Sequence, residues 1–274
     1  MQRRFNMFKN WFSLSISILT VMCICAIFLP AQTGGIKAND PKAKESIEAA
    51  LKALGGAEKI SDIKSLILKG TITTITKSDV PQIKPGTTLR EYEMRILLPD
   101  NYIIISRSSE RAGYRGIVKG DYYSSQSNTT NINNEVLKWR EIINWLHDLS
   151  GILLLPGPTP LELSSGSMPG VINMIVPAGK AAGMNGEIGE IEFAAKTGYP
   201  SVIRWNESTD FGNIPTTYTK EYSDRFSVNG IMFPRSINIS NKANIFSAEI
   251  INEIRINEVL INPKLSLKDF ENPK

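Results

Sequence analysis

The sequence predicts a mainly β fold of the α+β class: one curved antiparallel sheet of about eleven strands with two substantial helices. Three observations predict it. Apolar and polar residues alternate with a period of two over most of the chain, as in half-buried strands. Short turns rich in Pro, Gly and Asn separate these runs, and such turns join antiparallel neighbours. Two segments change to helical spacing, one before the alternating region and one inside it.

The N-terminus has the features of an export signal. Residues 11–30 carry no charge, Arg3, Arg4 and Lys9 precede them, and small polar residues follow. A basic, then apolar, then small order is typical of secretory signals. We therefore divide the chain into a signal peptide or N-terminal anchor at 1–38 and a single domain at 39–274.

Two fates of the signal remain open. Cleavage after Ala31 or Ala38 would release a soluble domain, and Pro30 with the small residues after it suits processing. At about 1.5 Å per residue, an uncleaved apolar run is also long enough to span a bilayer and tether the domain. Either outcome places the domain outside the cytoplasm.

Composition excludes several classes of function. Both cysteines, Cys23 and Cys25, lie in the apolar run, so the domain contains no disulfide scaffold, thiolate metal site or cysteine nucleophile. Of the 31 basic residues, three precede the apolar run, which leaves 28 against 27 acidic residues. A nearly neutral domain is not built to bind nucleic acid electrostatically.

Helix signals mark the two predicted helices. The first begins after Asp40, a good N-cap, has Pro41 in its first turn and ends at Gly55-Gly56. The second extends from Asn133 or Asn134 to Ser150-Gly151 and carries a broad apolar stripe. The stretch 151–170 is rich in Pro, Gly and Ser, which predicts an irregular, mobile loop.

No motif predicts catalysis, a cofactor or a metal. His147 is the single histidine, which rules out a zinc site, and its position predicts a surface or boundary residue of the second helix. Residues 177–181 lack the glycine and the Ser/Thr of a phosphate-binding loop and predict a turn. Glu190 and Glu192 share the polar face of one strand. We assign no catalytic residues, no metal ligands and no cofactor.

The strand pattern itself points to a concave apolar surface. A strongly curved antiparallel sheet has an apolar inner face that helices can cover. If they cover it incompletely, the gap is a cavity for an apolar ligand. If they fill it, the result is an ordinary solid core. Pattern alone leaves both outcomes open.

Several segments together resemble the outer-membrane lipoprotein carrier (LolA-like) superfamily. They follow one another in the family's order over nearly all of 39–274, although each alone is only a turn or strand edge. The segments are Ala53-Leu54-Gly55-Gly56, Ile63–Leu66, Leu98-Pro99-Asp100, Thr197–Pro200, Asp224-Arg225 before Gly230–Pro234, and Ile256-Asn257 leading to Phe270 and Pro273.

The resemblance implies an unclosed β-barrel, or half-barrel, of about eleven strands whose concave face is covered by helices. It also implies a non-enzymatic, monomeric carrier of lipoprotein acyl chains or other lipids in the periplasm, serving the outer membrane with membrane-associated donor and acceptor proteins. The helix 134–150 and the stretch after it would form a lid. Regions 77–88 and 166–189 have no counterpart in the family, and no basic residue that latches the lid is identified.

If the carrier reading is right, alternate strand positions and one face of the second helix line the cavity. Taken singly, each of these residues is better explained as ordinary core, and a register error of one residue would invert a strand's assignment. The predicted lipid-binding residues are Leu66, Leu68, Ile72, Met94, Ile96, Ile104, Phe193, Ile250 and Ile254 on strands, with Trp139, Ile143 and Leu146 on the helix.

Two other functions compete with the carrier. The same fold could serve as a membrane-tethered envelope sensor or a protein-interaction module, which a retained N-terminal anchor would favour. An exported hydrolase would need a serine and an acid beside His147. The three hypotheses differ in what they require of the concave face and of His147.

Overall fold

The computed structural model describes residues 36–78, 84–109, 112–119, 122–125, 134–155, 161–176, 187–209, 214–243 and 248–270. Of the predicted signal or anchor at 1–38, residues 1–35 lie outside these ranges. None of the helices within them combines the length and apolar character that a membrane crossing requires.

One sheet contains all thirteen strands of the described residues, in the order β1-β7-β8-β9-β10-β11-β12-β13-β2-β3-β4-β5-β6. Every neighbouring pair is antiparallel except β1 and β7, which are parallel. The strands are β1 Ile36–Ala38, β2 Ser65–Ser78, β3 Gly86–Leu97, β4 Asn101–Arg107, β5 Ala112–Val118, β6 Tyr122–Ser125, β7 Leu161–Ser165, β8 Val171–Ile175, β9 Glu187–Phe193, β10 Pro200–Thr209, β11 Ile214–Val228, β12 Ile231–Ala243 and β13 Ala248–Ile261.

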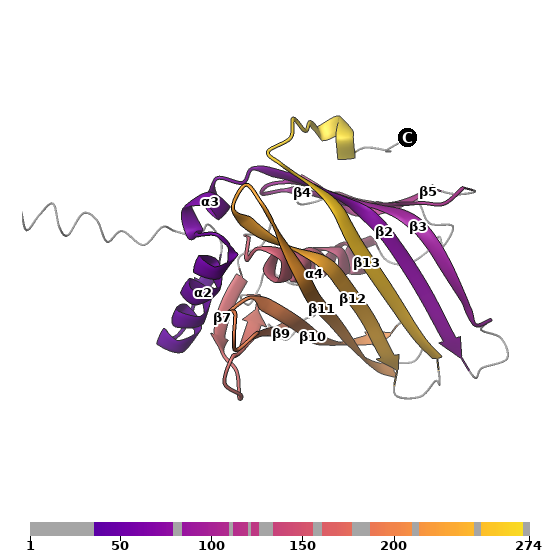
Figure 1. Ribbon diagram of the computed structural model, residues 1–274. Coiled ribbons are helices and arrows are strands. Elements are labelled where there is room, and N and C mark those ends of the chain that lie inside the picture. The colour runs from indigo at the N-terminus through magenta and orange to yellow at the C-terminus, as the bar shows by residue number, and fades with distance from the viewer. Residues whose placement is uncertain are drawn as a thin grey trace, which may run out of the picture. The chain divides into compact units, whose positions relative to one another are not determined.

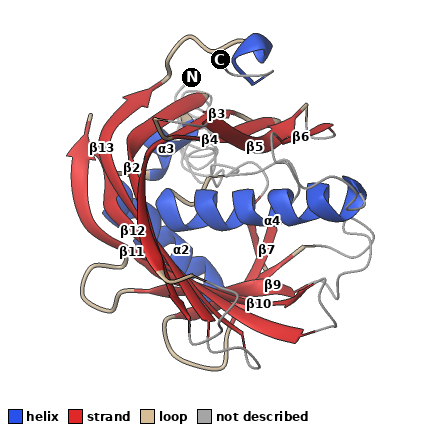
Figure 2. Cartoon of the chain, turned by 90° about the vertical axis from the view of Figure 1, so that its right-hand side faces the viewer, coloured by secondary structure: helices blue, strands red, loops and turns tan. Residues whose placement is uncertain are grey.

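The sheet curves around a central helix and is not closed into a barrel (Figures 1 and 2). Helix α4 (Asn134–Ile152) lies across the concave face, while α2 (Pro41–Leu54) and α3 (Ala57–Ser61) lie at one end. The predicted fold class, a mainly β fold with helices on the concave face of one unclosed sheet, is confirmed. The described residues form thirteen strands rather than about eleven.

Two of the strands lie where the sequence predicts none. β1 falls inside the segment assigned to the signal, and β7 falls inside the predicted mobile loop at 151–170, so that prediction is wrong for Leu161–Ser165. The two strands pair with each other, and Ile36 is buried. Cleavage after Ala31 would keep β1, whereas cleavage after Ala38 would remove it.

A β-bulge and a glycine mark a bend of the sheet between β2 and β13. The register shifts between Ile256 and Glu258, opposite Gly70 and Lys69. A methyl group on Gly70 would overlap the backbone carbonyl of Arg255, so only glycine fits there. Bulges bend and twist the strand that carries them, and this one contributes to the curvature that forms the concave face.

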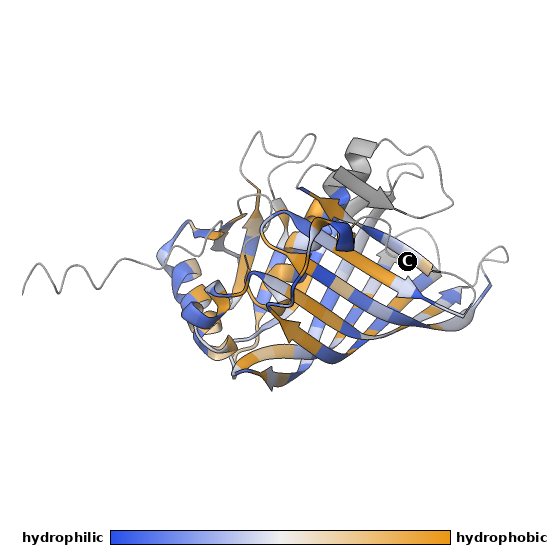
Figure 3. Cartoon of the chain, turned by 90° about the horizontal axis from the view of Figure 1, so that it is seen from above, coloured by the Kyte–Doolittle hydropathy of each residue, from blue (hydrophilic) through white to orange (hydrophobic). Residues whose placement is uncertain are grey.

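The alternation of residues assigns each strand position to one face. Figure 3 shows it as hydrophobic and hydrophilic blocks that alternate along the strands. In β2 the inward positions begin with Leu66 and Leu68, both fully buried, and their partners across β3 are Ile96 and Met94. Directly opposed residues point to the same side, so the register carries this assignment across the sheet.

Helix α2 is tied to the sheet through its N-cap. The Asp40 carboxylate accepts hydrogen bonds from the Ala43 amide at 2.9 Å, the Ser165 amide at 2.7 Å and the Ser165 hydroxyl at 2.6 Å. These bonds, with the Ser165 hydroxyl contributing most, lower the pKa of Asp40 to about 2. Gly55 ends the helix with φ +124°, a conformation that favours glycine. The cap predicted from the sequence therefore also joins α2 to β7.

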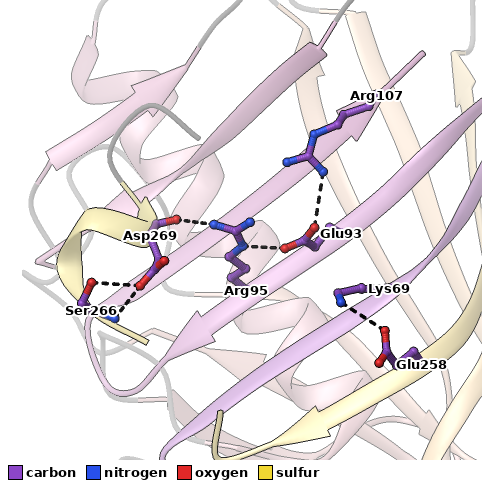
Figure 4. Close-up of polar contacts among 7 residues, drawn as sticks. All are labelled: Lys69, Glu93, Arg95, Arg107, Glu258, Ser266 and Asp269. Carbon is purple, nitrogen blue, oxygen red and sulfur yellow. Dashed lines mark hydrogen bonds and ion pairs between the residues drawn. The ribbon is translucent and has the colours of Figure 1, made fainter. Parts of the chain in front are cut away.

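The convex face carries a second, smaller core. The 3₁₀ helix η2 (Leu267–Phe270) packs there, and Phe270 is buried against Ile103, Ile105 and Val118. Figure 4 shows the polar frame beside it: Arg95 donates to the Asp269 carbonyl at 2.9 Å and pairs with Glu93, which also pairs with Arg107 at 3.3 Å. The end of the described chain thus covers β3–β5 from outside.

Replacing the cap tests its role in joining α2 to the sheet. Asp40→Ala should lower the melting temperature at pH 7, because the Ala43 and Ser165 donors lose their acceptor. The wild-type carboxylate contributes fully above its ordinary pKa of 3.8 and loses that contribution as pH falls toward 2. The difference in melting temperature from wild type should therefore narrow below pH 4. Glu45→Ala, an exposed change in the same helix, serves as the control; a pH-independent Asp40 effect would contradict the assignment.

Candidate functional site

The candidate site is the concave face of the sheet together with α4, which lies inside the arc of strands (Figure 2). One face of the helix is apolar because Ile142, Leu146 and Leu149 recur at helical spacing, and all three are buried. The helix extends to Ile152, two residues beyond the predicted end, and Leu153 to Leu155 are buried after it.

The predicted lining residues fall into three groups. Phe193, Ile254, Ile143 and Leu146 are buried in the same hydrophobic core as Leu66, Leu68, Met94 and Ile96. Ile72 and Ile104 pack against this core and are half-buried. Ile250 is 39% exposed and lies outside the core. Trp139 belongs to α4, but its side chain is not among the described ones. The predicted faces agree with the register in every described case.

Exposure of the inner face rises from one end of the sheet to the other. On β13, Ile254 is 4% exposed, whereas Ile250, two inward positions further, is 39% exposed. On β2, Leu66 and Leu68 are sealed, whereas Ile72 and Thr76 are partly exposed. Along β2 and β13 the concave face therefore has a sealed end and an accessible end that still carries apolar side chains.

A buried ion pair fixes α4 to the sheet. Lys220 of β11 donates to an Asp148 carboxylate oxygen at 2.9 Å, and both side chains are nearly inaccessible. The Tyr102 hydroxyl of β4 donates to the other oxygen at 2.7 Å. The Lys220 ammonium also lies 5.5 Å from the centre of the Trp205 ring. Asp148 thus joins two strands that are far apart in the sheet order.

A second pair lies on the same side of α4, about two helical turns before the first. Glu141 of α4 is buried, and Arg115 of β5, which reaches solvent, contacts it at 3.0 Å. Between Glu141 and Asp148, Trp145 stacks on Tyr102 with ring centres 5.3 Å apart. Burial raises the pKa of Tyr102, and the Asp148 charge adds to that rise. The polar face of α4 is therefore matched by polar groups on the sheet.

His147 lies in the core, so its predicted surface or boundary position is wrong. It is fully buried, its Nε2 donates to the Ile188 carbonyl at 2.9 Å, and its ring lies 4.4 Å from that of Trp205. Burial and the nearby Lys220 charge lower its pKa to about 3. The Nδ1 atom has no partner, so neither ring nitrogen contacts a serine or an acid.

Arg225 anchors the C-terminal end of α4. Its guanidinium donates to the carbonyls of Gly151 at 2.8 Å, Ile152 at 3.1 Å and Pro200 at 2.8 Å. The last carbonyls of a helix have no donors within the helix. The Arg225 guanidinium donates hydrogen bonds to two of them, those of Gly151 and Ile152. Burial lowers its pKa to about 10. A methyl group on Gly151 would overlap the Tyr222 ring, so glycine permits the close approach of helix and sheet.

Asp148, Lys220 and Arg225 belong to the site although the sequence pattern did not predict them as site residues. One signal for Lys220 was present: it stands between Tyr218 and Tyr222 on the inward parity of β11, where an apolar residue is the rule. Its partner lies 72 residues away on a helix, and no local pattern links the two. Within the described ranges, no three His, Cys, Asp or Glu side chains are placed to hold a metal ion.

Comparisons with known proteins concern the fold. No family model and no curated protein matches the sequence. Among solved structures, a LolA superfamily protein from Nitrosomonas europaea is 12% identical with a TM-score of 0.48, covering 84% of this chain and 97% of its own. An outer membrane lipoprotein-sorting protein domain from Vibrio parahaemolyticus is 9% identical with a TM-score of 0.43, over 84% and 97%.

A third solved structure, a DUF1329 family protein from Desulfovibrio piger, is 9% identical with a TM-score of 0.39, covering 85% of this chain and 98% of its own. Two of these three solved structures are described as a LolA superfamily protein and as an outer membrane lipoprotein-sorting domain, the group that the sequence motifs resemble.

Removing one member of the buried ion pair should destabilise the fold strongly. Asp148→Ala leaves the Lys220 ammonium buried without a counter-ion, a change that costs about 3–5 kcal/mol in free energy of unfolding. The double variant Asp148→Leu/Lys220→Met should lose less than the sum of the two single changes. Urea unfolding measures all of them.

The matched control is the exposed pair of Lys69 and Glu258 on the convex face, 3.1 Å apart (Figure 4). Glu258→Ala should change stability by less than about 1 kcal/mol. Equal losses for Asp148→Ala and Glu258→Ala would show that the buried pair does not hold the helix.

Burial of neutral His147 predicts a dependence of stability on pH. Between about pH 6.5 and pH 3 the unfolded chain binds a proton at this residue and the folded chain does not. Acidification over that range should therefore cost the wild type about 1.4 kcal/mol per pH unit. His147→Gln should remove this part of the slope in urea unfolding at a series of pH values. Identical slopes for the two proteins would mean that His147 is protonated in the folded state.

Proposed function

We propose that the protein is an exported, periplasmic carrier that binds acyl chains of lipids or lipoproteins on the concave face of its sheet. One observation supports this most: the inner face keeps apolar side chains, Ile250 foremost, at an end that α4 does not seal. Apolar residues facing inward yet left accessible are expected of a surface that receives a ligand.

Burial of the ligand's acyl chain supplies the binding energy. Each methylene removed from water contributes about 0.8 kcal/mol, so a long acyl chain needs no charged partner to be held. Ile239 and Ile72 are half-buried against the core and continue the apolar surface from Ile250 toward the sealed end. In this proposal the acyl chain completes a layer of packing that begins at the sealed end.

Helix α4 is the fixed inner wall of this site. Its C-terminal half is held by Arg225, by the Asp148–Lys220 pair and by His147, and releasing it would leave buried charges without partners. We therefore propose that ligands enter at the accessible end and that this half of the helix stays in place. The sequence predicted a movable lid over 134–150. In this proposal the C-terminal half of that helix is instead a fixed wall of the site.

The carrier needs no catalytic group, and the state of His147 supports a non-enzymatic function. A general base must reach the proton that it removes and must be able to hold it near neutral pH. His147 is fully buried, its Nε2 is occupied by the Ile188 carbonyl, and its pKa is about 3. These properties oppose the hydrolase hypothesis.

A matched pair of variants tests which face binds lipid. Ile250→Asp places a charge on the inner face at its accessible end, and Leu89→Asp places one on the outer face, where Leu89 is 66% exposed. Ile250→Asp should weaken binding of a fluorescent monoacyl lipid by at least about tenfold, since burying an unpaired carboxylate is unfavourable. Leu89→Asp should bind like the wild type.

Two results would overturn the proposal. Equal binding by both variants would place the lipid elsewhere, and failure of the wild type to bind any monoacyl lipid would remove the carrier function. Mass spectrometry of organic extracts from the purified exported form provides an independent check, with co-purified acyl lipid as the expected result.

A further inference from the structure

Three polar atoms on the sheet-facing side of α4 and on β3 are buried without a hydrogen-bond partner. They are the Tyr92 hydroxyl, the Trp145 Nε1 and the second carboxylate oxygen of Glu141. Tyr92 is 3% exposed, Glu141 3% and Trp145 0%. A buried polar group without a partner costs free energy, so such groups are rare unless water or a ligand completes them.

The three groups belong to one cluster. Glu141, Trp145 and Asp148 follow one another at helical spacing and face the same side of α4. Trp145 stacks on Tyr102, and Tyr102 donates to Asp148. Tyr92 is the inward residue of β3 next to Met94, and the register row of Met94 continues through Ile104 to Arg115, which contacts Glu141. Two donors and one acceptor are therefore left open in a single region.

This cluster adjoins the accessible end of the concave face. Tyr92 points inward on β3, and its inward neighbours on either side differ sharply: Met94 is 1% exposed, whereas Arg90 is exposed. Arg90 is paired with Ile72, which is half-buried. A ligand that advances along the inner face from the accessible end therefore reaches Tyr92 at the point where the face becomes sealed.

The charges near the three atoms without partners determine which kind of ligand these atoms can bind. Asp148 is balanced by Lys220 at 2.9 Å, and Glu141 by Arg115 at 3.0 Å. Beside these groups a further carboxylate would be a third negative charge, and both cations are already paired. The next cation on the inner face, Arg90, is exposed and lies one inward position further out than Tyr92. An uncharged ester or hydroxyl has no such penalty: a carbonyl is the kind of acceptor that the Tyr92 hydroxyl and the Trp145 N–H lack, and a hydroxyl is the kind of donor that Glu141 lacks.

We infer that the cluster of Tyr92, Trp145 and Glu141 binds the uncharged polar part of the cargo, so that the ligand is an acyl chain carried on a neutral hydroxyl-bearing ester, bound with its polar end innermost. This inference rests on the proposed function, because it specifies the ligand class of the same concave face. It assigns a binding role to three polar atoms that the fold leaves without partners.

The test compares two ligands that share one chain. At pH 8, 1-monopalmitoylglycerol should displace the fluorescent monoacyl lipid at a concentration at least about tenfold lower than palmitate does, because palmitate is then ionised. Tyr92→Phe should raise the dissociation constant of monopalmitoylglycerol by roughly 3- to 10-fold, the loss expected for one neutral hydrogen bond. It should leave that of palmitate unchanged.

Stability separates a binding role from a structural one. Because the Tyr92 hydroxyl has no partner in the ligand-free protein, Tyr92→Phe should leave the melting temperature unchanged or raise it. Tyr114→Phe, on the outer face of β5, is the matched control and should not alter either affinity.

Equal affinity for the two ligands, or an unchanged affinity for monopalmitoylglycerol in Tyr92→Phe, would overturn the inference while leaving the carrier function standing. Absence of binding by the fluorescent lipid itself would instead overturn the carrier function on which the inference rests.

Discussion

The arrangement of the whole molecule depends on one buried interaction, the ion pair between Asp148 of α4 and Lys220 of β11. Taking two charges out of water is costly, and the pair persists because the Tyr102 hydroxyl and the Trp205 ring add favourable contacts. These partners come from β4 on one side and from the neighbouring strands β10 and β11 on the other, with β12, β13, β2 and β3 between them. The Asp148 carboxylate of α4 therefore connects the helix to two distant parts of the curved sheet, at β4 and at β11.

This constraint determines what the concave face can do. With Arg225 on its last carbonyls and His147 bonded to the Ile188 carbonyl, the C-terminal half of α4 has a single position. The helix seals one end of the inner face with apolar packing and leaves the other end to Ile72, Thr76 and Ile250. A fixed helix beside a partly open apolar face suits a binding protein better than a solid structural core, in which Ile250 would have no reason to point inward.

The alternation of residues was enough to predict the faces of the long strands. Leu66, Leu68, Met94, Ile96 and Ile254 were assigned inward from a period of two, and the register agrees. The exposure of Ile250 was not predictable. It depends on where α4 ends relative to β13, and the sequence around Ile250 does not indicate this. The three-residue strand β1 was missed for a related reason, since only its pairing with β7 makes it a strand.

The polar residues of the site were the harder part. His147 was predicted at the surface because its own helical neighbours are partly polar, yet Trp205 and Ile188, far away in sequence, enclose it. Lys220 and Asp148 likewise acquire their roles only through a contact across 72 residues. Local pattern reports which side of an element is apolar, whereas a buried charge is explained only by the partner that the tertiary fold brings to it.

A crystal structure of the exported domain with a monoacyl lipid tests the central claim most directly. The account predicts continuous acyl density along the inner face beside Ile72 and Ile250, with the Asp148–Lys220 pair intact behind it. Lipid density on the convex face, or an inner face closed by the protein's own side chains while lipid binds elsewhere, would contradict it.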